Sequence, residues 1–200
     1  LAKIALNDAH LIKDDALMAK AYNVIALNFE EFYDVDKGLN YYKKALYHAN
    51  LTDNDSIKDW VNNNLGGLYS YRKNDFKTSI KYYKKALFYS EKIKDSIEIM
   101  YTRLNICSAY FAINDFKNGV EYLNGIKDFV GKGDQLEAKI SMCSMYGSYY
   151  SHLKDNAKAE TFFNEAIRLS KLNTTQLLDS NICDVYNDFA THYKSNKNYE

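Results

Sequence analysis

The sequence lacks an excess of charge of either sign and any long apolar run. Its 26 basic residues balance 26 acidic residues, which argues against a general nucleic-acid binder, because such proteins usually carry a basic excess or stripe. The lysine pairs at 43–44 and 84–85 come nearest to a basic patch, and a solvated helix face explains them better. No apolar run approaches the roughly 20 residues that cross a bilayer, so we expect no membrane span in this region.

Cysteine is also scarce. Cys107, Cys143 and Cys183 are odd in number and fall within expected helices, which indicates buried free thiols rather than a disulfide framework. Free thiols favour a reducing compartment. The cytoplasm is therefore the expected location, with a sensor region in the periplasm as the alternative.

The motifs of catalytic and metal sites are missing too. The four histidines form no H-E-x-x-H pattern and the cysteines no C-x-x-C pattern, so neither a metal site nor a cofactor is expected. The segment from Gly125 to Gly133 has the wrong spacing for a P-loop. Residues 53–56 begin like a calcium loop but lack its glycine and distal glutamate, so we interpret them as a turn and a helix N-cap. We therefore expect a protein that is not an enzyme.

The sequence does contain a repeat. Tyr-Tyr-Lys-Lys-Ala-Leu occurs at 41–46 and again at 82–87, and this spacing indicates a chain built from copies of one unit. Each copy has a small residue. In most copies an aromatic residue follows it by three positions and an aspartate follows it by eight. The small residues are Ala26, Gly67, Cys107, Gly147 and Ala190, and the aspartates are Asp34, Asp75, Asp115 and Asp155. Ser70 interrupts the aromatic row, with Tyr69 and Tyr71 beside it.

Each unit is predicted to consist of two helices. Apolar residues spaced i, i+3, i+4 and i+7, as from Tyr22 to Phe29, indicate the first helix. A short turn at 73–74 or 113–114 ends this helix. The aspartate that follows is expected to cap the second helix, because its carboxylate can accept the free amide hydrogens there. Asp95 and Glu98 form a similar capping pair before the next unit.

The order of these markers resembles that of the tetratricopeptide repeat, over nearly the whole chain. The resemblance implies an all-α fold, a right-handed α-α superhelix of antiparallel helix pairs. The units are about six residues longer than the usual 34, and the usual closing proline is absent, which suggests a longer second helix and a looser linker. Units of about 40 residues are similar to those of bacterial peptide-sensing receptors and of the sensory regions of kinases and transcription factors.

The repeat register divides the chain into parts of a single solenoid. We expect full units at 15–54, 55–95, 96–134 and 135–174, the second helix of a partial unit at 1–13 and the first helix of another at 175–200. Neither end has the polar capping unit with which a solenoid normally closes. We therefore expect a fragment of a longer polypeptide, or a chain whose ends are covered by a partner such as a second copy.

In the resembled family, first-helix positions between the packing residues line a concave face. In this register the candidate binding residues are mostly uncharged, and they are Asn23, Leu27, Asn64, Leu68, Tyr71, Leu104, Ser108, Phe111, Ser148 and His152. The asparagine amides can both donate hydrogen bonds to a peptide backbone and accept them from it. Tyr71 and Phe111 would supply apolar anchors. The alternative is that a composition rich in Asn, Lys and Tyr places such residues on every face.

Two functions remain as hypotheses. The first is a non-catalytic module that holds a protein or peptide in the groove, as the sensory part of a larger bacterial regulator, either a sensor kinase or a transcriptional regulator. The second is a structural scaffold or self-association solenoid with no groove ligand. Under either hypothesis the expected partner is a protein or peptide and not a nucleic acid.

Overall fold

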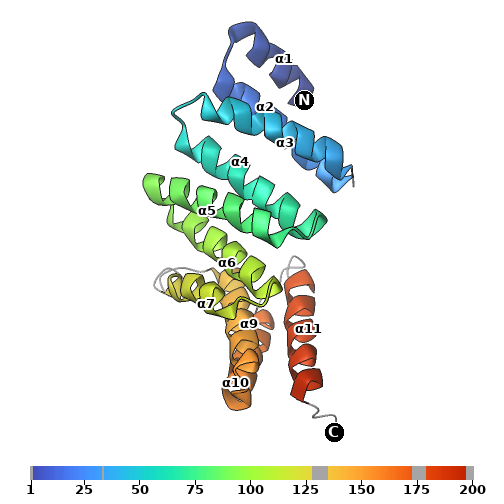
Figure 1. Ribbon diagram of the computed structural model, residues 1–200, viewed down its shortest axis with the longest axis vertical. Helices are drawn as coiled ribbons and strands as arrows, with labels where there is room; N and C mark the ends of the chain where they lie inside the picture. The colour runs from blue at the N-terminus through green and yellow to red at the C-terminus, as the bar shows by residue number, and fades with distance from the viewer. Residues whose placement is uncertain (1, 33, 128–134, 173–178, 197–200) are drawn as a thin grey trace. The chain divides into compact units, whose positions relative to one another are not determined.

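The fold consists of helices. The computed structural model describes residues 2–32, 34–127, 135–172 and 179–196, and all regular structure in these ranges is helical (Figure 1). Neighbouring helices form antiparallel pairs joined by short turns, as in α2 (Asp15–Glu31) with α3 (Val35–Asn50), α4 (Asp55–Gly67) with α5 (Phe76–Ile93), and α9 (Leu136–His152) with α10 (Asn156–Ser170). The prediction of an all-α fold built from antiparallel helix pairs is confirmed.

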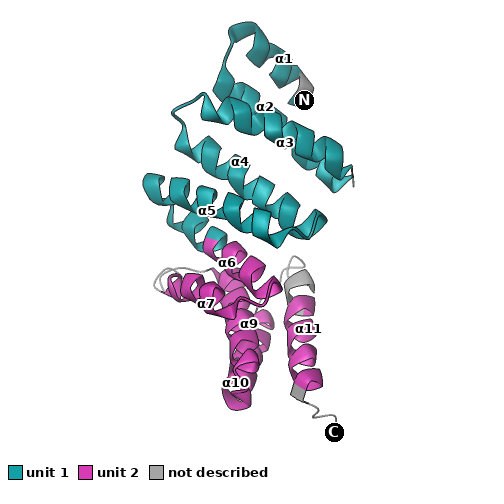
Figure 2. Cartoon of the chain, viewed as in Figure 1, with its two compact units in different colours: residues 1–102 teal, residues 103–200 magenta. Residues whose placement is uncertain are grey.

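The chain forms two compact units, an N-terminal unit of residues 1–102 and a C-terminal unit of residues 103–200 (Figure 2). The boundary between them falls within the sequence of α6. The helices up to this point are α1 (Ala2–Ile12), α2 (Asp15–Glu31), α3 (Val35–Asn50), α4 (Asp55–Gly67), the π-helical turn η1 (Leu68–Arg72), α5 (Phe76–Ile93) and α6 (Ser96–Ala112). Those that follow are α7 (Phe116–Asn124), α9 (Leu136–His152), α10 (Asn156–Ser170) and α11 (Asp179–Asn196). The division into repeat units stays a prediction.

Aspartates begin the second helix of each pair, as predicted. The side chains that cap α3, α5, α7 and α10 each accept a hydrogen bond of 3.1–3.3 Å from the backbone N–H three residues on, and they are Asp34, Asp75, Asp115 and Asp155. Asp95 accepts in the same way from Glu98, at 3.1 Å, before α6. Each cap satisfies an amide that the helix leaves unpaired at its positive end.

Five helices are preceded by a tight turn that contains neither glycine nor proline. In each turn, the residue directly before the aspartate at the start of the helix has a φ between 52° and 61°. These residues are Lys13, Asn74, Lys94, Asn114 and Lys154. Asparagine tolerates this left-handed backbone, whereas lysine is strained in it by roughly 1 kcal/mol. The predicted turns at 73–74 and 113–114 are thus confirmed, and they use asparagine where glycine is usual.

The two helices of a pair approach closely where a small residue faces a buried ring. A Cβ atom on Gly66 would lie 2.5 Å from Cδ1 of Tyr83, and one on Gly147 would lie 2.7 Å from Cδ1 of Phe163. Both rings are almost fully buried. At Gly67, by contrast, the nearest atom is 3.7 Å away. The close approach in this pair is therefore at Gly66, one residue before the position predicted from the sequence.

The π-helical turn explains the interrupted aromatic row. Stacked rings join the helices of each pair, with centroids 5.3–5.9 Å apart, in Phe29–Tyr41, Tyr69–Tyr82, Tyr110–Tyr122 and Tyr150–Phe162. Tyr69 rather than Ser70 is therefore the aromatic residue of its row, and it follows Gly66 by the usual three positions. One additional residue separates Tyr69 from Tyr82 compared with the other pairs. A π-helical turn accommodates one inserted residue, and η1 lies within this interval.

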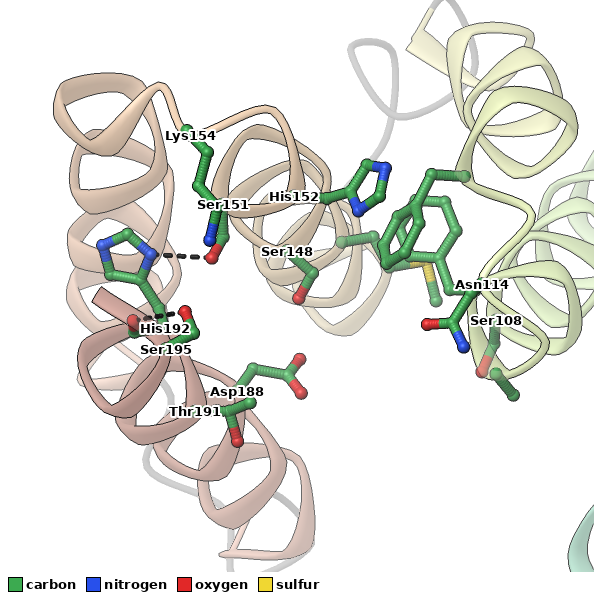
Figure 3. Close-up of a pocket in the computed structure, with 14 residues that line it drawn as sticks. Ser108, Asn114, Ser148, Ser151, His152, Lys154, Asp188, Thr191, His192 and Ser195 are labelled. Carbon is green, nitrogen blue, oxygen red and sulfur yellow. Dashed lines mark hydrogen bonds between the residues drawn. The ribbon is translucent and has the colours of Figure 1, made fainter. Parts of the chain in front are cut away.

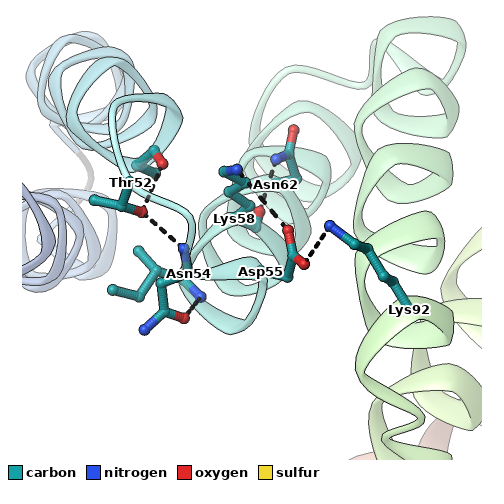
Figure 4. Close-up of polar contacts among 8 residues, drawn as sticks. Thr52, Asn54, Asp55, Lys58, Asn62 and Lys92 are labelled. Atoms are coloured by element: carbon teal, nitrogen blue, oxygen red, sulfur yellow. Dashed lines mark hydrogen bonds and ion pairs between the residues drawn. The ribbon is translucent and has the colours of Figure 1, made fainter.

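The start of α4 is held by polar contacts that the sequence predicted in part. Asn54 caps the helix, accepting a hydrogen bond from the Ile57 N–H at 3.1 Å, and its own N–H donates to Thr52 Oγ1 at 3.2 Å (Figure 4). The next residue, Asp55, forms an ion pair with Lys92 near the end of α5, at 2.6 Å. The interpretation of residues 53–56 as a turn and N-cap is confirmed.

The cysteines differ in exposure. Cys107 and Cys143 are buried free thiols, and burial raises their pKa values to about 12 and about 11. Such groups are inert at neutral pH because the reactive species is the thiolate. Cys183 is also free but exposed, so the expectation that all three are buried is wrong for this residue.

Candidate binding site

In the N-terminal unit the predicted binding residues do not share one exposed surface. Asn23 and Leu68 are fully buried in the core, and Asn64 is half-buried. Leu27 and Tyr71 are exposed, Tyr71 to 67%. Asn23 and Leu68 are therefore not available to a ligand in this structure.

The buried positions have a common physical cause. Asn23 lies three residues before Ala26, and residues three apart share a helix face, so Asn23 faces the partner helix together with the small residue. Leu104 lies three residues before Cys107 and is likewise buried, with 5% of its surface exposed. Leu68 is buried for a different reason. It is predicted to line the binding face because the sequence register puts Gly67 at the point of close approach, whereas this point is Gly66.

In the C-terminal unit four of the five predicted residues line one pocket of about 680 Å³. These are Ser108, Phe111, Ser148 and His152. Three first helices contribute to this pocket, because α6, α9 and α11 all provide side chains to it, as does the turn before α7 (Figure 3). We refer to it as the C-terminal pocket.

Its lining follows a simple helical rule. On α9 the lining residues Met145, Ser148 and His152 are spaced i, i+3 and i+7. On α11 the same spacing occurs in Asp188, Thr191 and Ser195. Residues at this spacing lie on one side of a helix, so each helix presents a single row of side chains to the pocket.

Polar contacts join α9 to α11 along one side of the pocket. Ser144 donates a hydrogen bond to Oδ2 of Asp188 at 2.8 Å. One turn further along α11, the Nδ1 atom of His192 lies 2.8 Å from Oγ of Ser151. Ser144 and Ser151 therefore orient the Asp188 carboxylate and the His192 imidazole.

The opposite side of the pocket is aromatic. The rings of Phe111 and Phe116 have centroids 4.7 Å apart, and the His152 ring stacks on Phe116 at 4.1 Å with an interplanar angle of 11°. These residues come from α6, α7 and α9. The pocket is therefore amphipathic, with rings on one side and hydroxyl and carboxylate groups on the other.

Burial changes the ionisation of two titratable groups on α11, Asp188 and His192. Burial raises the pKa of Asp188, the hydrogen bond from Ser144 opposes this change, and the nearby charge of Asp184 adds to it. Burial lowers the pKa of His192. The site therefore favours a neutral imidazole and makes the Asp188 carboxylate costly to keep charged.

A second, smaller hollow of about 270 Å³ adjoins the pocket, because Ser108, Met145 and Asp188 line both. Its lining adds Asp184, which lies one helical turn before Asp188 on α11, and Asn187. The two hollows together place two carboxylates along one side of the C-terminal unit.

The sequence prediction omits Asp188, His192 and Ser195. Asp188 lies two residues before the small marker Ala190, in the same place as Met145 before Gly147, and both line the pocket. The signal that could have found Asp188 was therefore present in the register. The predicted row used positions three before, one after and four after each small residue, and the first of these is buried at Asn23 and Leu104.

Neither a membrane span nor a metal site is evident in the described parts of the chain. Within these ranges no helix is long and apolar enough to cross a membrane. No group of three or more histidine, cysteine, aspartate or glutamate side chains among the same residues is placed to hold a metal ion.

Comparison with known proteins agrees with the fold. Residues 140–171, which cover most of α9 and α10, match the tetratricopeptide repeat family. The chain also resembles the crystal structure of BtubC (BKLC) from P. vanneervenii, with a TM-score of 0.77 and 16% sequence identity over 98% of this chain and 82% of that one. No curated protein matches the sequence.

Together these findings agree on one kind of fold. Residues 140–171 match a tetratricopeptide repeat, and the antiparallel helix pairs of the described residues have the arrangement that such repeats adopt. The likeness to BtubC shows the same fold and, at this identity, no more than the fold. Such repeats typically form surfaces for protein interaction rather than catalytic clefts.

Proposed function

We propose that the chain is a non-catalytic module that binds a protein or peptide segment in the C-terminal pocket. The observation that supports this most directly is the amphipathic lining built from three successive first helices. Its volume of about 680 Å³ lies within the range of pockets that hold small ligands or side chains. Hydroxyl groups such as that of Ser148 can bond to a peptide backbone, while Phe111 can contact an apolar side chain.

The finer proposal is that this module is the sensory part of a larger bacterial regulator. Its support is the unit length of about 40 residues, which is similar to that of peptide-sensing receptors and of sensory regions. The domain content of the whole polypeptide tests this point. A kinase or a DNA-binding helix-turn-helix in the same polypeptide would support it, and a polypeptide made of repeats alone would argue against it.

Selection from a displayed library of random peptides would test peptide binding at the pocket. We expect the purified protein to enrich particular sequences, and Phe111→Ala to weaken their binding by about 10-fold or more, since aromatic anchors dominate such contacts. Tyr186→Ala is the matched control, because Tyr186 is an aromatic residue of α11 that is 48% exposed and lies outside both hollows. Circular dichroism would check that both variants fold.

The proposal would be wrong if the library gave no enrichment. If enriched peptides bound the Phe111→Ala variant as well as the parent protein, binding would be established but its location in the C-terminal pocket would be refuted.

Self-association is a second candidate function, and an apolar hollow in the N-terminal unit favours it. This hollow of about 600 Å³ lies between α1 and α2, where Ile4, Leu17 and Val24 are exposed. Contiguous exposed apolar groups often mark protein interfaces. If a second copy covers them, sedimentation velocity will show concentration-dependent dimers that Leu17→Glu abolishes and Leu172→Glu, an exposed change in the C-terminal unit, does not. A monomer at all concentrations would exclude this function.

A further inference from the structure

We propose that the C-terminal pocket recognises a basic side chain, lysine or arginine, of the bound peptide segment, with the Asp188 carboxylate as its counter-ion. This inference rests on the proposed function, because it names the chemistry of the ligand for the same pocket. It goes further by assigning one residue of α11 to specificity.

The charges around the pocket support a cationic ligand. Asp184 and Asp188 lie one turn apart on α11, and their mutual repulsion is relieved when a cation binds between or beside them. Lys154 is the one lysine or arginine among the residues described as lining the two hollows. Its charge acts on His192, together with that of Glu160 on α10, and it is not among the groups that shift the Asp188 pKa. Within the described ranges no lysine or arginine forms an ion pair with Asp188.

The carboxylate is also held in place for such a contact. Ser144 on α9 donates a hydrogen bond to it, and the side chain points into the open space that Ser108 and Asn114 face from the other side (Figure 3). Burial has removed much of the water that would otherwise stabilise its charge. A buried carboxylate without a cation is destabilised, whereas an ammonium or guanidinium group that enters the pocket restores the missing charge pair.

The rest of the lining suits the stem of a basic side chain. Lysine and arginine bury their methylene groups against apolar surface while their charged ends reach a polar group. Met145 and the rings of Phe111 and Phe116 provide that apolar surface on the side of the pocket away from α11. The ring faces additionally attract a cation. A negatively charged or short polar side chain would gain neither contact.

A positional peptide library provides the test. Pools of nine-residue peptides, acetylated and amidated at their ends, carry one fixed central residue between randomised flanks, and their retention on the immobilised protein is compared. We expect the lysine and arginine pools to bind about 10-fold to 100-fold more strongly than the norleucine and glutamate pools, as a charge-assisted contact predicts. Asp188→Asn should remove this preference, since asparagine keeps the shape of the carboxyl group and lacks its charge. Glu137→Gln, an exposed change of the same charge on α9, should keep it.

Each outcome decides one point. Retention of other pools with no preference for lysine or arginine, or a preference that persists in Asp188→Asn, would overturn this inference and leave the proposed function standing. If no pool were retained, both would fail. Competition with cadaverine distinguishes the source of the cation: inhibition only at concentrations far above those of the peptides is expected, and equal potency would show that the pocket takes a free amine instead of a peptide.

Discussion

A buried carboxylate in the N-terminal unit makes the stability of the protein depend on pH near neutrality. Asp59 lies on α4 with 3% of its surface exposed, and its Oδ1 atom has no hydrogen-bond partner among the described residues. Burial raises its pKa from 3.8 to about 7, and the like charges of Glu98 and Asp95 at the start of α6 add to the effect. The folded protein therefore holds a proton on Asp59 that the unfolded chain has lost.

The sign and size of the effect follow from linkage. Below pH 3.8 both states are protonated and Asp59 costs nothing. Between pH 3.8 and 7 the unfolded chain releases the proton first, so the free energy of unfolding falls as the pH rises, and above pH 7 it levels off. Each pKa unit corresponds to about 1.4 kcal/mol, so a shift of about three units gives a loss of up to about 4 kcal/mol. Asp59→Asn removes the titration, because an amide resembles the protonated carboxyl group in shape.

Urea unfolding at several pH values, followed by circular dichroism, measures this difference. We expect Asp59→Asn to match the parent protein near pH 4 and to exceed its stability by up to about 4 kcal/mol near pH 8. Asp53→Asn is the control, since Asp53 is exposed in the turn before α4. Carbon-13 NMR of the Asp59 carboxyl group reports the titration directly. A stability difference that does not change with pH, or an NMR midpoint near 4, would refute the reasoning.

Four further substitutions test the packing and the backbone conformation of the helices. Gly66→Ala should destabilise the protein by about 1–3 kcal/mol, because the added Cβ meets the buried Tyr83 ring. Gly67→Ala should instead stabilise it by about 0.5–1 kcal/mol, because alanine favours the helix more than glycine does. Chemical denaturation measures both changes, and the same sign for the two would contradict the register. Lys94→Gly should stabilise by about 0.5–1 kcal/mol, since φ is 58° there, and a lower melting temperature would argue against backbone strain. Asn23→Leu should raise the free energy of unfolding by about 1–2 kcal/mol, because neither polar atom of this buried amide has a partner among the described residues; a loss of stability would show that the amide is satisfied.

The fold was predictable because its determinants are local and repeated. A capping aspartate such as Asp75 acts on amides three residues away, and a small residue meets the ring of the next helix at a nearly constant distance along the chain. Such rules can be found in a single sequence once the copies are aligned. The alignment was wrong by one residue at Gly67, because two adjacent glycines left the choice open and the π-helical turn shifts the sequence that follows.

The binding site was less predictable because the chemistry of its residues changes from one helix to the next, although their positions repeat. Ser148 and His152 lie on the pocket side of α9, and the register identified both. The sequence prediction missed Asp188. The equivalent position on α9 holds Met145, an apolar residue that gives no indication of a polar site. The contact between Ser144 and Asp188 joins residues far apart in sequence, and no local pattern indicates that these two helices face each other with their polar sides.

Equivalent positions on different first helices carry side chains of different chemistry. The positions two before and one after the small residue are Val24 and Leu27 on α2, and both are exposed apolar residues. On α11 they are Asp188 and Thr191, in a pocket whose other polar groups include Ser148. The apolar row suits contact with another copy and the polar row suits a charged peptide, so Leu17→Glu should leave peptide retention intact and Asp188→Asn should leave self-association intact. A variant that altered both would show that the two surfaces act as one.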